Sequence, residues 1–137
     1  LYTVLSKQFP ADGEFWSGMA QEERQHSAAF RQLKVALATG TLRLDESALH
    51  PQAIQSAIDY IEAIIRGVEQ NRYPYVKVLS EIWDFQQNLL QSGLFWALHA
   101  PAGKESPVIE RIAQETEAHR LKLEQKWQQE KNKAAAL

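Results

Sequence analysis

The chain has 137 residues, of which 45% are hydrophobic and 23% are charged, with a formal net charge of −2 at pH 7. This composition predicts one globular domain with its own core, and the small net charge gives no electrostatic basis for binding nucleic acid or an anionic membrane. The lack of cysteine excludes disulfides, thiol catalysis and cysteine-ligated iron–sulfur or zinc sites, and it suits the cytoplasm, where we expect the protein. No apolar run approaches the roughly 20 residues that a membrane-spanning helix needs.

The N-terminal third predicts one helix end and one long helix. Residues 1–8 have the pattern of the last turns of a helix, which Phe9 and Pro10 end, and we expect the earlier turns to precede residue 1. Asp12 is the expected N-cap of a second helix that runs to about residue 39, where a glycine follows.

A connector over residues 41–50 leads to a third helix, which Pro51 opens. Its buried face is wholly apolar, so we expect this helix to be a crossover that serves as core scaffolding. The face comprises Ile54, Ile58, Ile61, Ile65 and Val68.

The C-terminal half predicts two more helices. After a break at residues 71–74, a fourth helix is expected over residues 75–99, with Gln86 as the one polar member of its buried face. A loop over residues 100–103 precedes the last helix, which Ser106 and a following proline open and which is predicted to end near residue 131.

No segment has the pattern of a strand. Long amphipathic helices joined by short turns and one longer crossover predict an all-α fold, an up-down bundle over residues 1–133. Residues 134–137 are expected to be a vector-derived linker and are left out of the fold.

Two polar residues interrupt the buried face of the second helix. Steps of three and four residues place seven side chains on one stripe, and five of them are large and apolar. The stripe comprises Trp16, Met19, Glu23, His26, Phe30, Leu33 and Leu37. A carboxylate buried at such a position is costly unless it is paired, hydrogen-bonded or bound to a metal. The pattern therefore predicts a partner opposite Glu23.

The last helix repeats this register 93 residues later. His119 corresponds to His26, and the apolar Ile112 corresponds to Met19. At the position of Glu23, however, the second copy has a threonine, Thr116. Two helices therefore carry a polar centre at equivalent heights, and only the first of them has the carboxylate.

These polar residues form a candidate metal site. Glu23 and His26 point the same way, so they can bind one ion, and His119 and Gln86 can approach from the facing helices. The alternative is a buried hydrogen-bonded cluster in which Glu23 accepts bonds from the other three residues. Spacing and burial leave both interpretations open.

A wider pattern near the N-terminus resembles a known family. It comprises Tyr2, Leu5, Phe9-Pro10 and Phe15-Trp16, followed by Met19-Ala20-x-Glu22-Glu23-x-x-His26. The pattern is similar to that of the ferritin-like superfamily, in its rubrerythrin-type branch, and the similarity covers nearly the whole chain. It implies a four-helix bundle with an additional crossover helix around a carboxylate-bridged di-iron or di-manganese site. The family takes a Glu from the first and third bundle helices and a Glu-x-x-His from the second and fourth.

The ligand set that the resemblance implies is incomplete in this chain. Three of six positions match, and they are Glu23, His26 and His119. Thr116 replaces the second Glu of a Glu-x-x-His, Gln86 (or Gln87) replaces the Glu of the third bundle helix, and the first-helix Glu would precede residue 1. Glu22 and Glu115 each lie four residues before a histidine, but we expect both to point away from the stripe.

We therefore expect at most one ion per chain, iron or another divalent metal, or none. The resemblance implies a rubrerythrin-like, metal-binding oxidoreductase that handles peroxide or iron, and without cysteine it would need a separate electron donor. The alternative is a non-catalytic ferritin-like bundle that serves as a dimerisation or protein-interaction module. A homodimer is expected in either case.

Overall fold

The computed structural model describes residues 1–48, 50–99 and 106–136, and within these ranges the protein is mostly α-helical. The helices are α1 (Tyr2–Gln8), α2 (Gly13–Ala38), α3 (Pro51–Glu69), α4 (Tyr75–Gln91) and α5 (Pro107–Ala135). Short 3-10 turns occur at Pro10–Asp12, Glu46–Ala48 and Leu94–Ala97. The all-α prediction is confirmed at this level.

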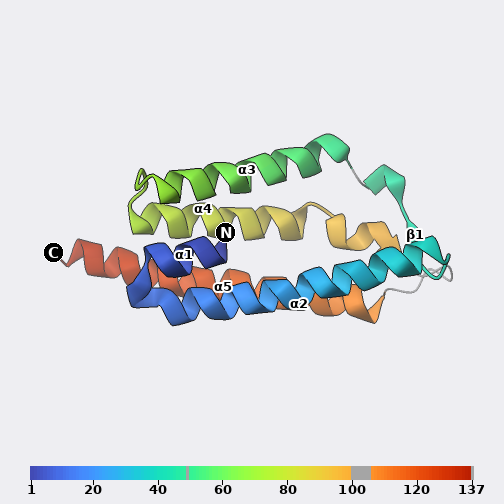
Figure 1. The fold of residues 1–137 in the computed structure, drawn as a ribbon, viewed down its shortest axis with the longest axis horizontal. Helices are drawn as coiled ribbons and strands as arrows, with labels where there is room; N and C mark the ends of the chain where they lie inside the picture. The colour runs from blue at the N-terminus through green and yellow to red at the C-terminus, as the bar shows by residue number, and fades with distance from the viewer. Residues whose placement is uncertain (49, 100–105, 137) are drawn as a thin grey trace.

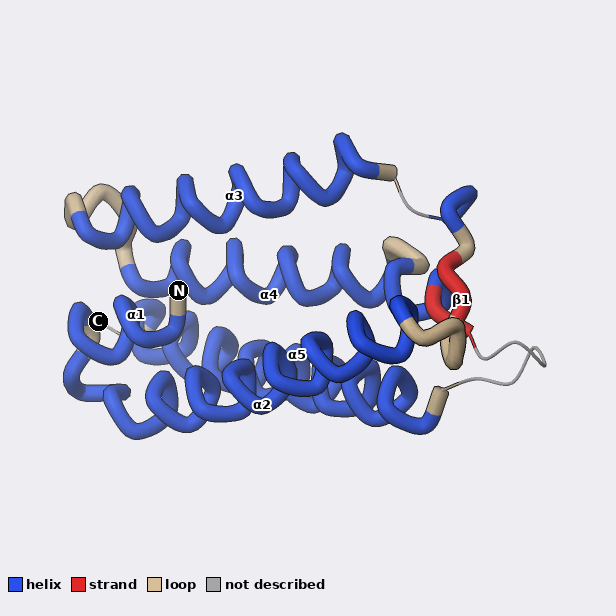
Figure 2. The backbone as a smooth tube through the Cα atoms, turned by 45° about the vertical axis from the view of Figure 1, so that its right-hand side comes forward, coloured by secondary structure: helices blue, strands red, loops and turns tan. Residues whose placement is uncertain are grey.

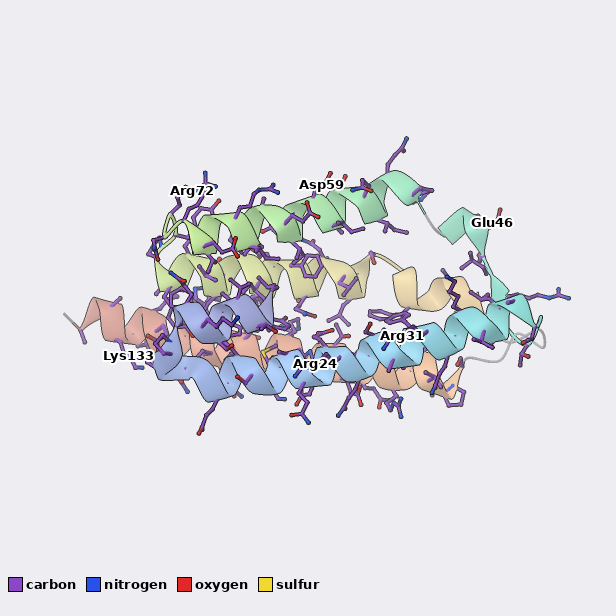
Figure 3. The ribbon with its side chains drawn as sticks, viewed as in Figure 1. Arg24, Arg31, Glu46, Asp59, Arg72 and Lys133 are labelled. Atoms are coloured by element: carbon purple, nitrogen blue, oxygen red, sulfur yellow. The ribbon has the colours of Figure 1, made fainter. Side chains whose placement is uncertain are left out.

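The long helices lie alongside one another in an elongated molecule (Figure 1). In both views α2 and α5 lie side by side, and α4 lies between this pair and α3 (Figures 1 and 2). The short α1 folds back along the first half of α2 and also contacts α3. The charged residues labelled on α2 and α3, Arg24, Arg31 and Asp59, are exposed (Figure 3).

Most predicted helix limits agree with the structure. Proline begins α3 and α5 at the first helical position, and Asp12 precedes α2, although its carboxylate pairs with Lys126 instead of capping the helix. Gly40 has a φ of +74°, a left-handed conformation that suits a residue just after a helix end.

Two predictions about secondary structure are wrong. The helix expected over residues 75–99 ends at Gln91, because Gly93 adopts a φ of +73° and a 3-10 turn follows. The chain also contains strands: β1 (Arg43–Leu44) and β2 (Leu98–His99) form a two-residue antiparallel pair. The last helix extends to Ala135, beyond its expected end, since alanine is the strongest helix former. The loop expected at 100–103 lies outside the described residues.

The apolar interior consists of two clusters. One gathers around Trp16, Leu79 and Leu123, and the other around Leu33, Phe95 and Ile112. Both α2 and α5 contribute to both clusters, so the segments of these helices that carry the polar residues lie between the two. The fold thus places the candidate site in the middle of the α2–α5 pair.

Not every residue of the predicted apolar stripes is buried. Phe30 is 40% exposed, and in α3 Ile54 and Ile58 are 40% and 48% exposed. The first half of α3 borders a groove of about 580 Å³ beside α4, lined by Ile54, Tyr60 and Phe85, among others. A helix face that borders a groove keeps part of its apolar surface exposed, whatever its periodicity. Among the described residues, no helix is long and apolar enough to cross a membrane.

Candidate metal site

One carboxylate, Glu23, lies between two buried histidines. Its Oε2 is 3.3 Å from Nδ1 of His26, and its Oε1 is 3.1 Å from Nδ1 of His119. The histidines are 5% and 1% exposed, and their ring centroids are 5.4 Å apart. One ligand atom from each of the three residues lies within 4.8 Å of the others. The predicted meeting of Glu23, His26 and His119 is therefore confirmed, although the Glu23 side chain is 38% exposed and not deeply buried.

The outer nitrogens of both rings contact carboxylates of the opposite helix. Nε2 of His26, on α2, is 2.6 Å from Oε2 of Glu115 on α5. Nε2 of His119, on α5, contacts Oε2 of Glu22 on α2 at an even shorter distance. The expectation that these two glutamates point away from the site is wrong. Their long side chains leave the flank of each helix and reach across to the neighbouring one.

This crosswise arrangement follows the 93-residue repeat. Glu22 and Glu115 are equivalent in the repeat, and so are the two histidines that they contact. The aligned segments Met19–Glu22 and Ile112–Glu115 were the sequence signal that could have revealed the pair. Spacing within one helix concealed it, because each glutamate contacts the histidine of the other helix.

The cluster has more hydrogen-bond acceptors than neutral imidazoles can satisfy. Each histidine faces carboxylate oxygens with both of its ring nitrogens, which makes four nitrogen–oxygen contacts. A neutral imidazole has only one N–H, and its other nitrogen is an acceptor. Two neutral rings therefore leave two contacts in which acceptor faces acceptor. Only protons or a metal cation can make those contacts favourable.

The pKa shifts of His119 and Glu23 reflect the same excess of carboxylate oxygens around the two rings. Burial acts to lower the pKa of His119, but contacts with the carboxylates of Glu23 and Glu22 outweigh it, and the net shift is upward. Burial acts to raise the pKa of Glu23, but the hydrogen bond from His119 and the charge of His26 outweigh it, and the net shift is downward. The site therefore favours positive charge between the rings.

The polar residue of α4 lies near this cluster but is not bonded to Glu23 as the hydrogen-bonded interpretation required. Gln86 is 3% exposed and donates from Nε2 to Oη of Tyr2 at 2.9 Å. Its Oε1 is buried without a hydrogen-bond partner in the described structure. Tyr2, Glu23 and Gln86 line the same cavity of about 350 Å³, whereas Gln87 does not. Burial, followed by the charge of Glu23, raises the pKa of Tyr2.

The threonine at the position where the resemblance implies a second carboxylate forms its hydrogen bond within its own helix. Thr116 is 3% exposed, and its Oγ1 donates to the backbone oxygen of Ile112 at 2.8 Å. The hydroxyl donor of Thr116 is thus already bonded within α5, and the side chain adds no charge to the site.

The donor set fits one divalent ion. Ligands at about 2.0–2.1 Å from a tetrahedral ion lie about 3.4 Å apart. The two Nδ1 atoms lie 3.3 and 3.1 Å from the two different oxygens of Glu23, and one donor atom from each residue lies within 4.8 Å of the others, so small side-chain shifts would bring the three donors onto one ion. One carboxylate and two imidazoles suit zinc, iron or manganese. A pair of ions needs further bridging carboxylates, and Thr116 supplies none. The residues present therefore fit a single ion and not a complete di-metal centre.

No family model, curated protein or solved structure matches this chain.

Proposed function

We propose that this protein binds one divalent metal ion per chain, held by Glu23, His26 and His119. The observation that carries the proposal is that Nδ1 of both histidines faces the same carboxylate at 3.1–3.3 Å. A cation of charge +2 would replace the two protons that those contacts otherwise require, so it would balance the charge of the cluster. Oε1 of Gln86 is buried without a hydrogen-bond partner, and this neutral oxygen could serve as a further ligand.

A rubrerythrin-like redox role is the activity that we propose for the loaded protein. It rests on the ferritin-like resemblance and on the cavity of about 350 Å³ that Glu23 lines, which has room for a small molecule such as peroxide. A bound iron or manganese ion would supply the redox chemistry. The chain itself would hold the ion, and Tyr2 and Gln86 would bond to the small molecule. Since the sequence has no cysteine, electrons would come from a separate donor.

One observation favours the second candidate, a non-catalytic bundle that acts as a dimerisation or interaction module. Thr116 and Gln86 occupy two positions where the resemblance implies carboxylates, and neither residue carries a charge. A bundle that has lost those ligands would keep its fold without its chemistry.

The test is a titration of metal-free protein with Zn²⁺, Mn²⁺ and Fe²⁺, the last without oxygen. We expect one ion per chain in the wild type and a loss of binding in Glu23→Gln. The matched control is Glu110→Gln, which makes the same charge change at an exposed position on α5 and should bind normally. Binding that is absent in the wild type, or equal in Glu23→Gln, would overturn the proposal.

A redox assay separates the two candidate functions. Iron- or manganese-loaded protein is given peroxide and a chemical electron donor, and turnover is compared with that of Glu23→Gln. Metal-dependent turnover supports the rubrerythrin-like role. Stable metal binding without turnover, together with a dimer in solution, supports the interaction module.

A further inference from the structure

The two outer glutamates, Glu22 and Glu115, are the polar residues of the cluster that no proposed ligand role uses. They are 41% and 46% exposed, and each crosses between α2 and α5 to reach a histidine on the other helix. Each is also held by a cation on α5. Lys122 contacts both oxygens of Glu22 at 3.1 Å, and Arg111 lies 3.9 Å from Glu115.

The contacts on the two sides of each ring are unequal. The Nε2 contacts, at 2.6 Å for His26 and closer for His119, are shorter than the Nδ1 contacts at 3.3 and 3.1 Å. A hydrogen bond to a carboxylate is short when the nitrogen carries the proton, and a long contact suits a nitrogen that carries a lone pair. For His26, the contact of 2.6 Å against 3.3 Å favours Nε2 as the nitrogen that carries the single N–H of the neutral ring, and His119 faces Glu22 in the equivalent arrangement.

The other nitrogen then faces the interior. When Nε2 carries the proton, Nδ1 has the lone pair, and both Nδ1 atoms are directed at Glu23. Which nitrogen of a histidine can bind a metal is set by the hydrogen bond that the other nitrogen makes. Two glutamates on the flanks of the helices would thus determine which atoms the site offers.

We infer that Glu22 and Glu115 are positioning residues that hold His119 and His26 in the Nε2–H tautomer, each from the opposite helix, so that both Nδ1 atoms are available to one ion. This inference rests on the proposed metal-binding function. It adds that the site forms only when α2 and α5 are docked, because each positioning carboxylate comes from the other helix. The 93-residue repeat accounts for the twofold character of the arrangement.

The test reads the tautomers directly in metal-free protein. Two-dimensional ¹H–¹⁵N NMR, at a pH high enough that both rings are neutral, distinguishes Nε2–H from Nδ1–H for each ring. We expect Nε2–H for both rings in the wild type. Glu22→Ala should change the tautomer balance of His119 and leave His26 unchanged, and Glu115→Ala should do the reverse.

Conservative variants separate positioning from charge. In Glu22→Gln and Glu115→Gln the amide oxygen still accepts the Nε2–H, so the tautomer should be kept, whereas the alanine variants lose it. Zn²⁺ affinity should fall by about 10- to 100-fold in each alanine variant and recover in large part in the glutamine variants. Glu110→Ala serves as the control for loss of an exposed carboxylate on α5.

The outcomes distinguish this inference from the function on which it rests. Nε2–H tautomers that depend on the two glutamates, in a protein that binds no metal, would uphold the positioning role and overturn the proposed function. The positioning role alone would be overturned if the protein binds metal while its rings are Nδ1–H. It would also be overturned if the protein binds metal and both alanine variants keep the tautomers and the metal affinity of the wild type.

Discussion

Metal binding should release protons, because the ion and the protons compete for the same nitrogens. Four nitrogen–carboxylate contacts surround the two histidines, and two neutral rings supply two N–H groups for them. A fully hydrogen-bonded metal-free cluster therefore carries two extra protons, and both lie on the side of Glu23 where the ion would bind. The raised pKa of His119 makes at least one of these protons present in mildly acidic solution.

The expected magnitude follows from this count. In mildly acidic solution, binding of Zn²⁺ should release protons from the cluster, and at a pH well above the raised pKa of His119 the release should approach zero. Each released proton makes the apparent affinity rise about tenfold per pH unit in the range where it titrates, so two protons give about a hundredfold. Lowering the pH therefore weakens binding.

Isothermal titration calorimetry measures the release. The same titration is run in two buffers of different ionisation enthalpy, and the difference in observed heat gives the number of protons. Glu110→Gln should release the same number as the wild type. Release near zero in mildly acidic solution, with normal binding, would refute the argument, because it would mean that no proton occupies the ligand positions.

Three further predictions concern stability. Gly67→Ala should lower the free energy of unfolding by about 1–3 kcal/mol, because a Cβ there would lie 2.0 Å from the ring of Tyr73, and Tyr73→Ala in the same chain should recover part of the loss. Trp16→Phe should cost about 1–3 kcal/mol, since Trp16 is fully buried and its Nε1 donates to Oη of Tyr75 at 3.1 Å. The free energy of unfolding of metal-free wild type should exceed that of metal-free His119→Gln by the largest amount between about pH 4.5 and 6.5.

The sign of the pH effect follows from the two shifts. The raised pKa of His119 stabilises the folded protein below the unfolded value of 6.5, and this contribution is lost as the pH rises through the folded pKa. The lowered pKa of Glu23 stabilises the protein above 4.5, and that contribution is lost as the pH falls through the folded pKa. Urea unfolding across this range measures all three predictions. A flat difference between wild type and His119→Gln, a Gly67→Ala variant as stable as wild type, or a neutral Trp16→Phe would each contradict the corresponding argument.

The helices and the centre of the site could be predicted because both depend on local periodicity. Steps of three and four residues placed Glu23 and His26 on a buried stripe, and the repeat placed His119 at the same height on another helix. Because α2 and α5 pack against the same core, their equivalent positions in the repeat lie close together, and the three residues meet.

The roles of Glu22 and Glu115 could not be predicted in the same way. Both lie on the flank of a helix, where a side chain with several rotatable bonds can extend into solvent or bend toward a neighbour. Only the distance between α2 and α5 decides which, and that distance is a property of the packed structure. The exposure of Ile54 and Ile58 has a similar origin, because an apolar stripe does not show whether a neighbour covers it.

The most direct test of the account is a crystal structure of the full protein grown with Zn²⁺ or Mn²⁺, with anomalous scattering collected at the metal edge. We expect one anomalous peak per chain, within bonding distance of Nδ1 of His26, Nδ1 of His119 and a carboxylate oxygen of Glu23. Two peaks would show that other residues complete a di-metal centre. No peak at these atoms, in crystals whose metal content is confirmed, would contradict the proposal that the cluster is a metal site.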